Sequence, residues 1–347
     1  MRSDERYGGS IRVWRHMKPT LPALLACPTC HGELSLSAVL ASDGDEIMGA
    51  TLGCAGCQAE YPVRGGVPIF LAPDEQASHV AQSFGFEWQT FHEGGFEQDR
   101  VFGLTLDEDI ASFFEGLDIE SSDLDGAIVL DAGCGSGSLT TELARRNPQA
   151  TFIGLDLNPA IAEVYRASRD LANLHVVRAS VFSVPAREEA FDFIWCNGVL
   201  HHTGDTRRGF DELARVTKRG GRLYAWLYER KPSPLVAVRN LLQPLGLHDW
   251  SHRFLYWVCW VLAVPTFLAV QLMALVRRLP MIRSRTRLRV LTRDRGLREL
   301  VLTWFDVLSP KYRDTCSEDE LVGWFEVSDF DALKRYWWPV GVSGTRT

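Results

Sequence analysis

The stretch that decides the fold is Ile128-Val129-Leu130-Asp131-Ala132-Gly133-Cys134-Gly135-Ser136-Gly137-Ser138. A short apolar run, which predicts a strand, gives way to glycines at three alternate positions, and the residues from 138 to 145 have the spacing of a helix. Glycine adopts positive φ angles without strain and lets a ligand approach the backbone, while a helix start offers free N–H groups. The stretch therefore predicts a strand, a tight turn and a helix. A ligand site and a glycine-rich turn without a ligand remain the two alternatives.

Downstream of this turn, short apolar runs alternate with amphipathic stretches, which is typical of βαβ units and a parallel sheet. Further strands are predicted at 150–156, 175–178, 191–195 and 221–227. A helix is predicted over 206–217, ended by basic residues and Gly220-Gly221. Asp156 lies 19 positions after Gly137, near the spacing at which an acid reaches the ribose hydroxyls of a nucleoside bound at the first turn. The turn and the acid together favour a nucleoside ligand.

Two C-x-x-C pairs precede this region. Cys27 and Cys30 are separated from Cys54 and Cys57 by 23 residues, a spacing typical of a zinc ribbon. The first 17 residues are charged and contain no apolar core, so they do not resemble a secretory signal. We therefore expect a reducing cytoplasm, where such pairs bind metal rather than form disulfides. Four thiolates complete a tetrahedral zinc site and predict a structural role; redox-active thiols and an emptied site are the alternatives.

Length and charge set broad limits. The 347 residues exceed the usual size of a single hydrophobic core and predict more than one domain. The formal net charge of −7 gives no overall attraction for nucleic acid.

Four segments together resemble the successive motifs of class I S-adenosylmethionine-dependent methyltransferases: Asp131–Gly137, Gly154–Asn158, Phe191–His202 and Lys218–Leu223. The resemblance implies an α/β Rossmann-like sheet, mostly parallel with an antiparallel last strand, and S-adenosyl-L-methionine as the cofactor. It also implies that the glycine turn faces the methionine part of the cofactor and that Asp156 binds its ribose. The N-terminal segment resembles the zinc ribbons fused to some bacterial methyltransferases.

The resemblance implies cofactor contacts at Asp131, Gly133, Gly135, Gly137, Asp156, Leu157, Ser180, Val181 and Asn197. Family members often have an acid for the adenine amino group where this chain has Ser180, and a hydroxyl binds the base more weakly. His201 and His202 follow the fourth strand, where a histidine can accept the proton of a hydroxyl acceptor. The alternative is that the pair shapes the turn or touches the cofactor. Residues 197–200 lack the Pro-Pro-aromatic pattern of enzymes that methylate DNA base amines, which counts against that substrate.

The predicted organisation has six parts. They are an N-terminal arm (1–22), the zinc ribbon (23–73), a helical cap (74–125), the methyltransferase core (126–229), an inserted helical lid (230–316), and a C-terminal helix with the last two strands (317–347).

The insertion contains an apolar run without charge, residues 254–276, which is long enough as a helix to span a bilayer. A single span would separate the last two strands from the sheet, and the next apolar run, 297–305, is too short to return. Pro265 predicts a break into two shorter helices. The main alternatives are a helix pair that lies in or re-enters a membrane, and a soluble apolar lid or dimer interface.

Residues 277–298 hold nine arginines and one acid, Asp294. Beside an apolar run, arginines can bind anionic lipid headgroups or the pyrophosphate of a lipid carrier; RNA phosphates and a solvated helix face are the alternatives. The sequence thus predicts a methyltransferase, cytoplasmic or peripheral on the inner face of a membrane contacted by 254–298. Its acceptor would be small, hydrophobic or lipid-linked, a glycan or natural-product intermediate methylated on oxygen. A ribosomal or transfer RNA methyltransferase and a non-catalytic membrane-peripheral binding protein are the competing hypotheses.

Overall fold

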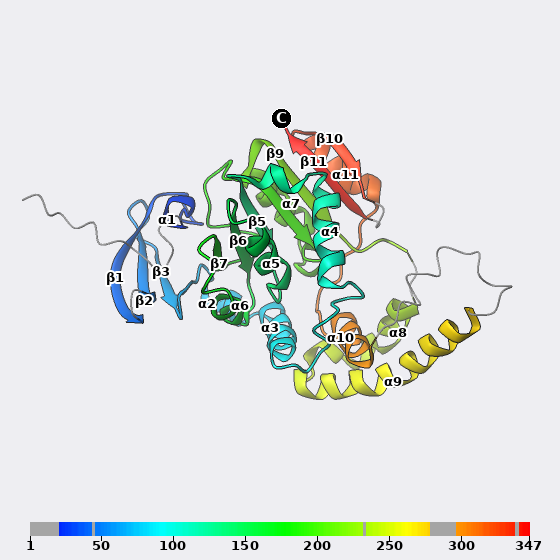
Figure 1. Ribbon diagram of the computed structural model, residues 1–347. Coiled ribbons are helices and arrows are strands. Elements are labelled where there is room, and N and C mark those ends of the chain that lie inside the picture. The colour runs from blue at the N-terminus through cyan, green and yellow to red at the C-terminus, as the bar shows by residue number, and fades with distance from the viewer. Residues whose placement is uncertain (1–20, 44–45, 232–233, 278–295, 337–339) are drawn as a thin grey trace, which may run out of the picture.

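The computed structural model describes residues 21–43, 46–231, 234–277, 296–336 and 340–347. A central sheet lies between a small N-terminal sheet and a group of helices from the insertion (Figure 1). Most of the predicted arm and the arginine-rich residues 278–295 lie outside the described residues.

The central sheet has seven strands in the order β10-β11-β9-β8-β5-β6-β7. Their bounds are β5 (Ile128–Ala132), β6 (Thr151–Asp156), β7 (Leu174–Arg178), β8 (Phe191–Asn197), β9 (Thr217–Trp226), β10 (Phe330–Arg335) and β11 (Gly341–Arg346). Strands β5 to β9 pair in parallel, and β11 pairs antiparallel with both β9 and β10. The predicted fold class is confirmed. The strand order reverses at β5, which opens a crevice at the carboxyl ends of the strands.

Helices cover both faces of this sheet. Their bounds are α4 (Leu106–Leu117), α5 (Ser138–Arg146), α6 (Ile161–Ala167), α7 (Thr206–Val216) and α11 (Glu318–Val327). Neighbouring residues of β5 point to opposite faces, as the period of a strand requires: Val129 packs with α4 and α5, whereas Leu130 packs with α7 and α11. Helix α11 begins at a capping box, in which Ser317 and Glu320 bind each other's backbone N–H groups.

Strand β9 begins earlier than predicted. We expected Gly220-Gly221 to end the preceding helix, but α7 ends at Val216 and the chain is extended from Thr217. Gly220 has a φ of +78° and lies at a register irregularity between β8 and β9. Gly220 and Gly221 therefore lie in a bulge of β9 and do not cap the helix.

The N-terminal module, residues 21–71, is an antiparallel sheet after a short helix. Its elements are α1 (Leu21–Leu24), β1 (Leu34–Asp43), β2 (Glu46–Cys54), β3 (Glu60–Arg64) and β4 (Val67–Pro68). Directly after β4, the backbone N–H of Phe70 donates to the carbonyl of Arg178 at 2.8 Å, and Ile69 forms a parallel bridge with Arg178. The module thus continues the edge of the central sheet beside β7.

The remaining helices lie at the carboxyl edge. The cap contributes α2 (Pro73–Gln76) and α3 (His79–His92), and the insertion contributes α8 (Pro234–Leu242), α9 (His252–Arg277) and α10 (Leu297–Leu308). Helix α10 lies between α9 and the core (Figure 1). Short 3-10 helices occur at 121–124, 200–202, 243–245 and 247–249.

The predicted break at Pro265 is wrong, because α9 runs through that residue. Pro265 is solvent-exposed, while Ala263 beside it is buried in the cluster that α9 shares with α10, and Phe267 packs against the same cluster. Packing on that side holds the helix together despite the missing backbone hydrogen bond. From His252 to Leu272, α9 is long and apolar enough to cross a membrane, with a mean hydropathy of 1.8, and 22% of it is buried.

Candidate functional site

The glycine turn after β5 is a tightly packed cradle. Gly133 and Gly135 have φ angles of +91° and +55°, which favour glycine. A Cβ atom on Gly133 would lie 2.2 Å from Val199, and one on Gly135 would lie 2.8 Å from the indole of Trp88. Neither position has room for a side chain.

Asp156 ends β6 beside this turn. Its two carboxylate oxygens accept the backbone N–H groups of Gly135 and Asn158, each at 2.9 Å. Burial raises the pKa of Asp156, and these N–H groups act against that rise. A carboxylate oxygen can accept more than one hydrogen bond, so Asp156 keeps capacity for ligand hydroxyls. The arrangement fits the ribose of an adenosine cofactor.

A cavity of about 570 Å³ opens above these residues, within the range of small-molecule sites. Seven of the nine predicted cofactor residues line it: Gly133, Gly135, Asp156, Leu157, Ser180, Val181 and Asn197. Asp131 and Gly137 are not among the lining residues. Asp131 is buried behind the turn, accepts a hydrogen bond from Thr140 and has its pKa raised to about 7 by burial. Gly137, at the start of α5, has a φ of +71° and packs against Val164 of α6.

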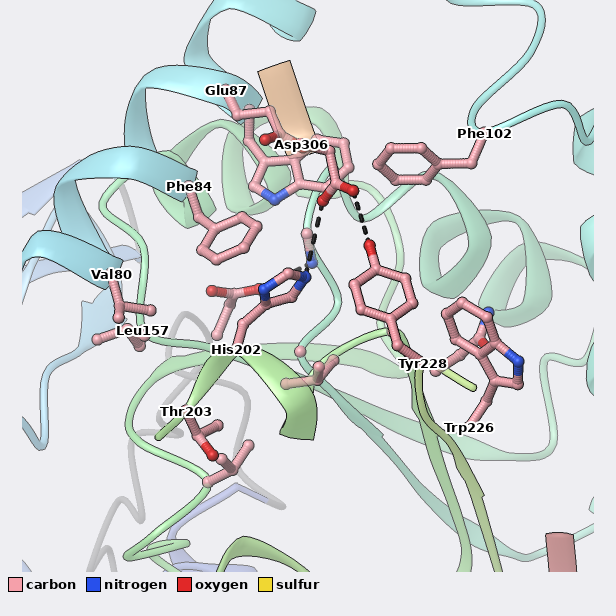
Figure 2. A pocket seen from close by; sticks show the side chains of 18 of the residues that line it. Val80, Phe84, Glu87, Phe102, Leu157, His202, Thr203, Trp226, Tyr228 and Asp306 are labelled. Carbon is pink, nitrogen blue, oxygen red and sulfur yellow. Dashed lines mark hydrogen bonds and ion pairs between the residues drawn. The ribbon is translucent and has the colours of Figure 1, made fainter. Parts of the chain in front are cut away.

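The two predicted histidines separate in space. His202 lines the cavity near Asp306 (Figure 2). Its Nδ1 lies 3.1 Å from the carbonyl oxygen of Tyr312. A carbonyl only accepts, so Nδ1 carries the proton, and Nε2 lies 3.7 Å from a carboxylate oxygen of Asp306. Burial lowers the pKa of His202, with Asp306 acting in the opposite direction. His202 is therefore a neutral histidine whose basic nitrogen is at the cavity.

His201 is not among the residues that line the cavity. Its ring lies on Tyr228 with 3.7 Å between the ring centroids, and neither ring nitrogen has a hydrogen-bond partner in the described part of the chain. Burial moves its pKa well below the usual range. The structure thus brings only His202 to the cavity.

Two acids that line the cavity, Glu87 of α3 and Asp306 of α10, were not predicted from the sequence. We call the part of the cavity wall that these two helices form its roof. Glu87 of α3 is fully buried, and neither of its carboxylate oxygens has a hydrogen-bond partner among the described residues. Burial and the nearby Asp306 raise its pKa well above the usual range. Asp306 of α10 accepts the hydroxyl of Tyr228 at 2.7 Å. An acid within the aromatic run 84–88 was the available signal for Glu87; Asp306 had none.

Many aromatic side chains also line the cavity: Phe84, Trp88, Phe102, Phe182, Trp195, Tyr224, Trp226, Tyr228, Tyr312 and Tyr336. Among the described residues, five acids line the same cavity, and Arg313 is the one lining arginine or lysine. Its guanidinium lies 3.7 Å from the centroid of the Tyr228 ring. The interior therefore suits an apolar molecule with hydrogen-bond donors, and disfavours phosphates.

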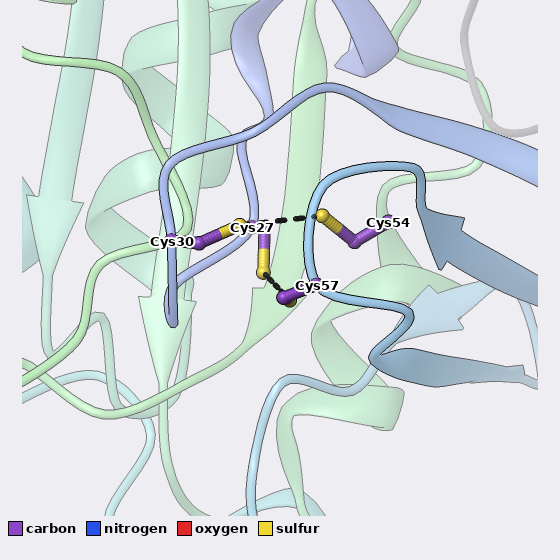
Figure 3. A group of neighbouring side chains, drawn as sticks. All are labelled: Cys27, Cys30, Cys54 and Cys57. Carbon is purple, nitrogen blue, oxygen red and sulfur yellow. Dashed lines mark hydrogen bonds between the residues drawn. The ribbon is translucent and has the colours of Figure 1, made fainter.

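The four predicted metal ligands converge in the N-terminal module. The sulfurs of Cys27, Cys30, Cys54 and Cys57 all lie within 4.8 Å of one another (Figure 3). Cys27 and Cys57 are 3.6 Å apart, and Cys30 and Cys54 are 3.4 Å apart. Tetrahedral zinc, with Zn–S bonds of about 2.3 Å, requires sulfurs roughly 3.8 Å apart. The cluster fits zinc, and four thiolates leave no position for a substrate.

Comparison with protein families agrees with this geometry. Residues 130–225 match the family described as "Methyltransferase domain", and residues 18–66 match the family "Trm112p-like protein". The central sheet is a class I methyltransferase domain. The N-terminal module is a Trm112-like metal-binding module with a four-cysteine cluster.

Individual relatives match the methyltransferase region in part. A ubiquinone biosynthesis O-methyltransferase from Alkalilimnicola ehrlichii is 30% identical over 137 residues, covering 37% of this chain and 55% of the relative. A tRNA (carboxymethyluridine(34)-5-O)-methyltransferase from Arabidopsis thaliana is 29% identical over 146 residues, covering 41% and 33%. The chain thus spans less than two thirds of either protein. The structure of N-methyltransferase NodS from Bradyrhizobium japonicum with S-adenosyl-L-homocysteine is 20% identical, with a TM-score of 0.34, covering 43% of this chain and 72% of NodS.

Proposed function

We propose that this protein transfers a methyl group from S-adenosyl-L-methionine to a hydroxyl of a small, largely apolar acceptor. The observation that carries the proposal is the position of His202 on the wall of an aromatic cavity that also contains the glycine cradle and Asp156. Gly133, Gly135 and Asp156 would hold the cofactor, and Ser180 and Val181 would lie along its adenine. The bound cofactor supplies an electrophilic methyl group on a sulfonium.

His202 would act as the general base. The Tyr312 carbonyl fixes the proton on Nδ1, so Nε2 is free to accept the acceptor's hydroxyl proton. Nε2 would take the hydroxyl proton while the oxygen receives the methyl group that the cofactor would supply, with the thioether product as the leaving group. Asp306 would then stabilise the resulting imidazolium from 3.7 Å. Holding the hydroxyl in line with the methyl group supplies much of the rate.

The roof of the cavity restricts the acceptor. An unpaired, buried carboxyl such as Glu87 costs free energy, which a hydrogen bond from a ligand hydroxyl would recover. The aromatic wall would bind an apolar body. These features support a lipophilic acceptor with more than one hydroxyl, such as a lipid-linked glycan or a natural-product intermediate. Because the apolar α9 packs on α10, which lines the cavity, they also support a location on the inner face of a membrane.

Tritiated S-adenosyl-L-methionine incubated with the purified protein and a total lipid extract tests the proposal. We expect label in the organic phase as an alkali-stable methyl ether, and a loss of roughly a hundredfold or more in His202→Gln. Activity of the wild type should persist below the usual histidine pKa, because the lowered pKa keeps His202 unprotonated there. Absence of cofactor binding in calorimetry would refute the enzyme and favour the binding-protein hypothesis.

RNA methylation is the second candidate, favoured by the nine arginines of 277–298 and by the similarity to a tRNA methyltransferase. The lining of the cavity counts against it, since Arg313 is the one arginine or lysine among its described lining residues and little positive charge is available for the phosphates beside a target nucleotide. Nucleic acid that stays with the protein through a high-salt wash, together with label in RNA, would support this alternative.

A further inference from the structure

The outer face of α9 carries an apolar stripe. Six large apolar side chains on it are between 46% and 72% exposed: Phe254, Trp257, Val261, Val264, Leu268 and Leu272. Their spacing of three and four residues places them on one side of the helix. At 1.5 Å per residue the stripe is about 27 Å long. An exposed apolar surface of this extent indicates a binding face.

The opposite face of α9 is already occupied. Leu255, Cys259 and Ala263 are buried in the cluster that α9 shares with α10, and Val270 further along the helix is also buried. The indole N–H of Trp304 in α10 also donates to the hydroxyl of Thr266 at 3.0 Å. These contacts extend along most of the helix, so α9 can present only its outer side to a partner. A helix held in this way is suited to lie along a surface and not to cross a bilayer.

We propose that the α9 stripe docks onto an anionic lipid surface, with α9 in the plane of the membrane. No residue from Phe254 to Val276 is charged, and the run of nine arginines begins at Arg277, where α9 ends. Arginines at the edge of an apolar face bind anionic headgroups while that face enters the acyl boundary. Near the other end, Trp257 is of the type enriched at membrane–water interfaces.

Charge distinguishes a lipid surface from a second copy of this chain. Two-fold pairing through the α9 stripe would bring two runs of nine arginines, each with one acid, into a single assembly. Because the two runs carry the same sign of charge, they add no attraction to such a pairing. An anionic bilayer instead offers negative charge beside the same apolar face, and we therefore assign the stripe to lipid.

Flotation of the full-length zinc-loaded protein tests this assignment. The probes are vesicles of phosphatidylcholine alone and of phosphatidylcholine mixed with phosphatidylglycerol. We expect flotation with the mixed vesicles that weakens as salt is added, because salt screens the arginines. Leu268→Glu should weaken this binding roughly tenfold or more, since it removes a large apolar contact and adds a repelled charge. Leu40→Glu is the matched control, because Leu40 is 73% exposed in β1, away from the stripe.

Three outcomes would overturn the assignment: no flotation with the mixed vesicles, equal flotation of Leu268→Glu and wild type, or a lipid-free dimer that only Leu268→Glu converts to a monomer. The last would assign the stripe to a second copy. Calorimetry with S-adenosyl-L-methionine on the same preparations separates this test from the proposed methyl transfer. Both glutamate variants should bind the cofactor as the wild type does, and a wild type that floats without binding it would refute only the enzyme.

Discussion

The N-terminal module and the insertion lie beside the same methyltransferase sheet, yet they contribute to the cavity in different ways. None of the cavity-lining residues comes from the described part of the module, whereas the insertion supplies Leu235, Thr303, Asp306, Val307, Tyr312 and Arg313. The module contributes indirectly, through contacts outside the cavity. The backbone N–H of Phe70 donates to the Arg178 carbonyl, and the Arg178 guanidinium donates to the carbonyl of Leu157 at 3.1 Å. The difference suggests that the module supports the cofactor side of the fold and that the insertion selects the acceptor.

The largest effect should come from loss of the metal. Cys27→Ser removes one of the four thiolates that fit a zinc ion. We expect zinc binding to supply folding free energy to the module, on the order of 10 kcal/mol as in zinc-finger peptides. We expect zinc, at about one ion per wild-type chain, to be largely lost. Melting of the module should then weaken cofactor binding through Phe70, Arg178 and Leu157. Elemental analysis, circular dichroism and calorimetry measure the three effects.

Cys259→Ser provides the control, because Cys259 and Cys27 are both fully buried and lose the same sulfur. It should keep its zinc and its cofactor affinity while losing some stability in the insertion. If both variants retained zinc and melted alike, the expectation that Cys27 binds zinc and that zinc stabilises the module would be wrong.

Local patterns explain why the module and the sheet were predictable. A C-x-x-C pair fixes two ligands by its own turn, and the glycine turn has steric requirements that depend on few residues. The limits appear where tertiary packing decides. Local rules predict that Pro265 ends a helix. Instead α9 continues through it, because neighbouring α9 residues such as Ala263 are buried against α10.

The second-largest effect concerns cofactor binding in the methyltransferase sheet, to which both the N-terminal module and the insertion are attached. Asp156→Ala should weaken S-adenosyl-L-methionine binding by roughly 1–3 kcal/mol, because the ribose hydroxyls lose their acceptor. Zinc content and vesicle flotation should stay unchanged, since Asp156 touches neither feature. Calorimetry with S-adenosyl-L-homocysteine measures the loss without an acceptor. An affinity equal to that of the wild type would remove Asp156 from the cofactor site.

The acceptor side of the cavity shows what the sequence could not provide. Glu87 and Asp306 come from α3 and α10, more than two hundred positions apart, and meet only because both helices pack over the carboxyl edge. The adjacent histidines look equivalent in sequence, but the chain turns so that His202 faces the cavity while His201 stacks on Tyr228. Asp131 shares the motif of the glycine turn but points to Thr140 of α5.

The smallest effect concerns the roof of the cavity and depends on pH. The pKa of Glu87 is raised in the folded protein, so the folded state keeps its proton at pH values where the unfolded chain, with a pKa near 4.5, has lost it. The unfolding free energy contributed by this group therefore falls as pH rises above that value. Glu87→Gln removes the dependence, and we expect the variant to gain about 1–3 kcal/mol over wild type near neutral pH and little in acid.

Urea unfolding of Glu87→Gln at both pH values measures this gain, with Glu326→Gln as the control because Glu326 is exposed on α11. The control should differ little from wild type at either pH. A gain in stability combined with lost methyl transfer would show that the insertion side of the cavity sacrifices stability to bind its acceptor. Equal stability of Glu87→Gln and wild type at neutral pH would mean that the carboxyl is paired in solution. Glu87 would then give no reason to assign acceptor selection to the insertion and support of the cofactor side to the N-terminal module.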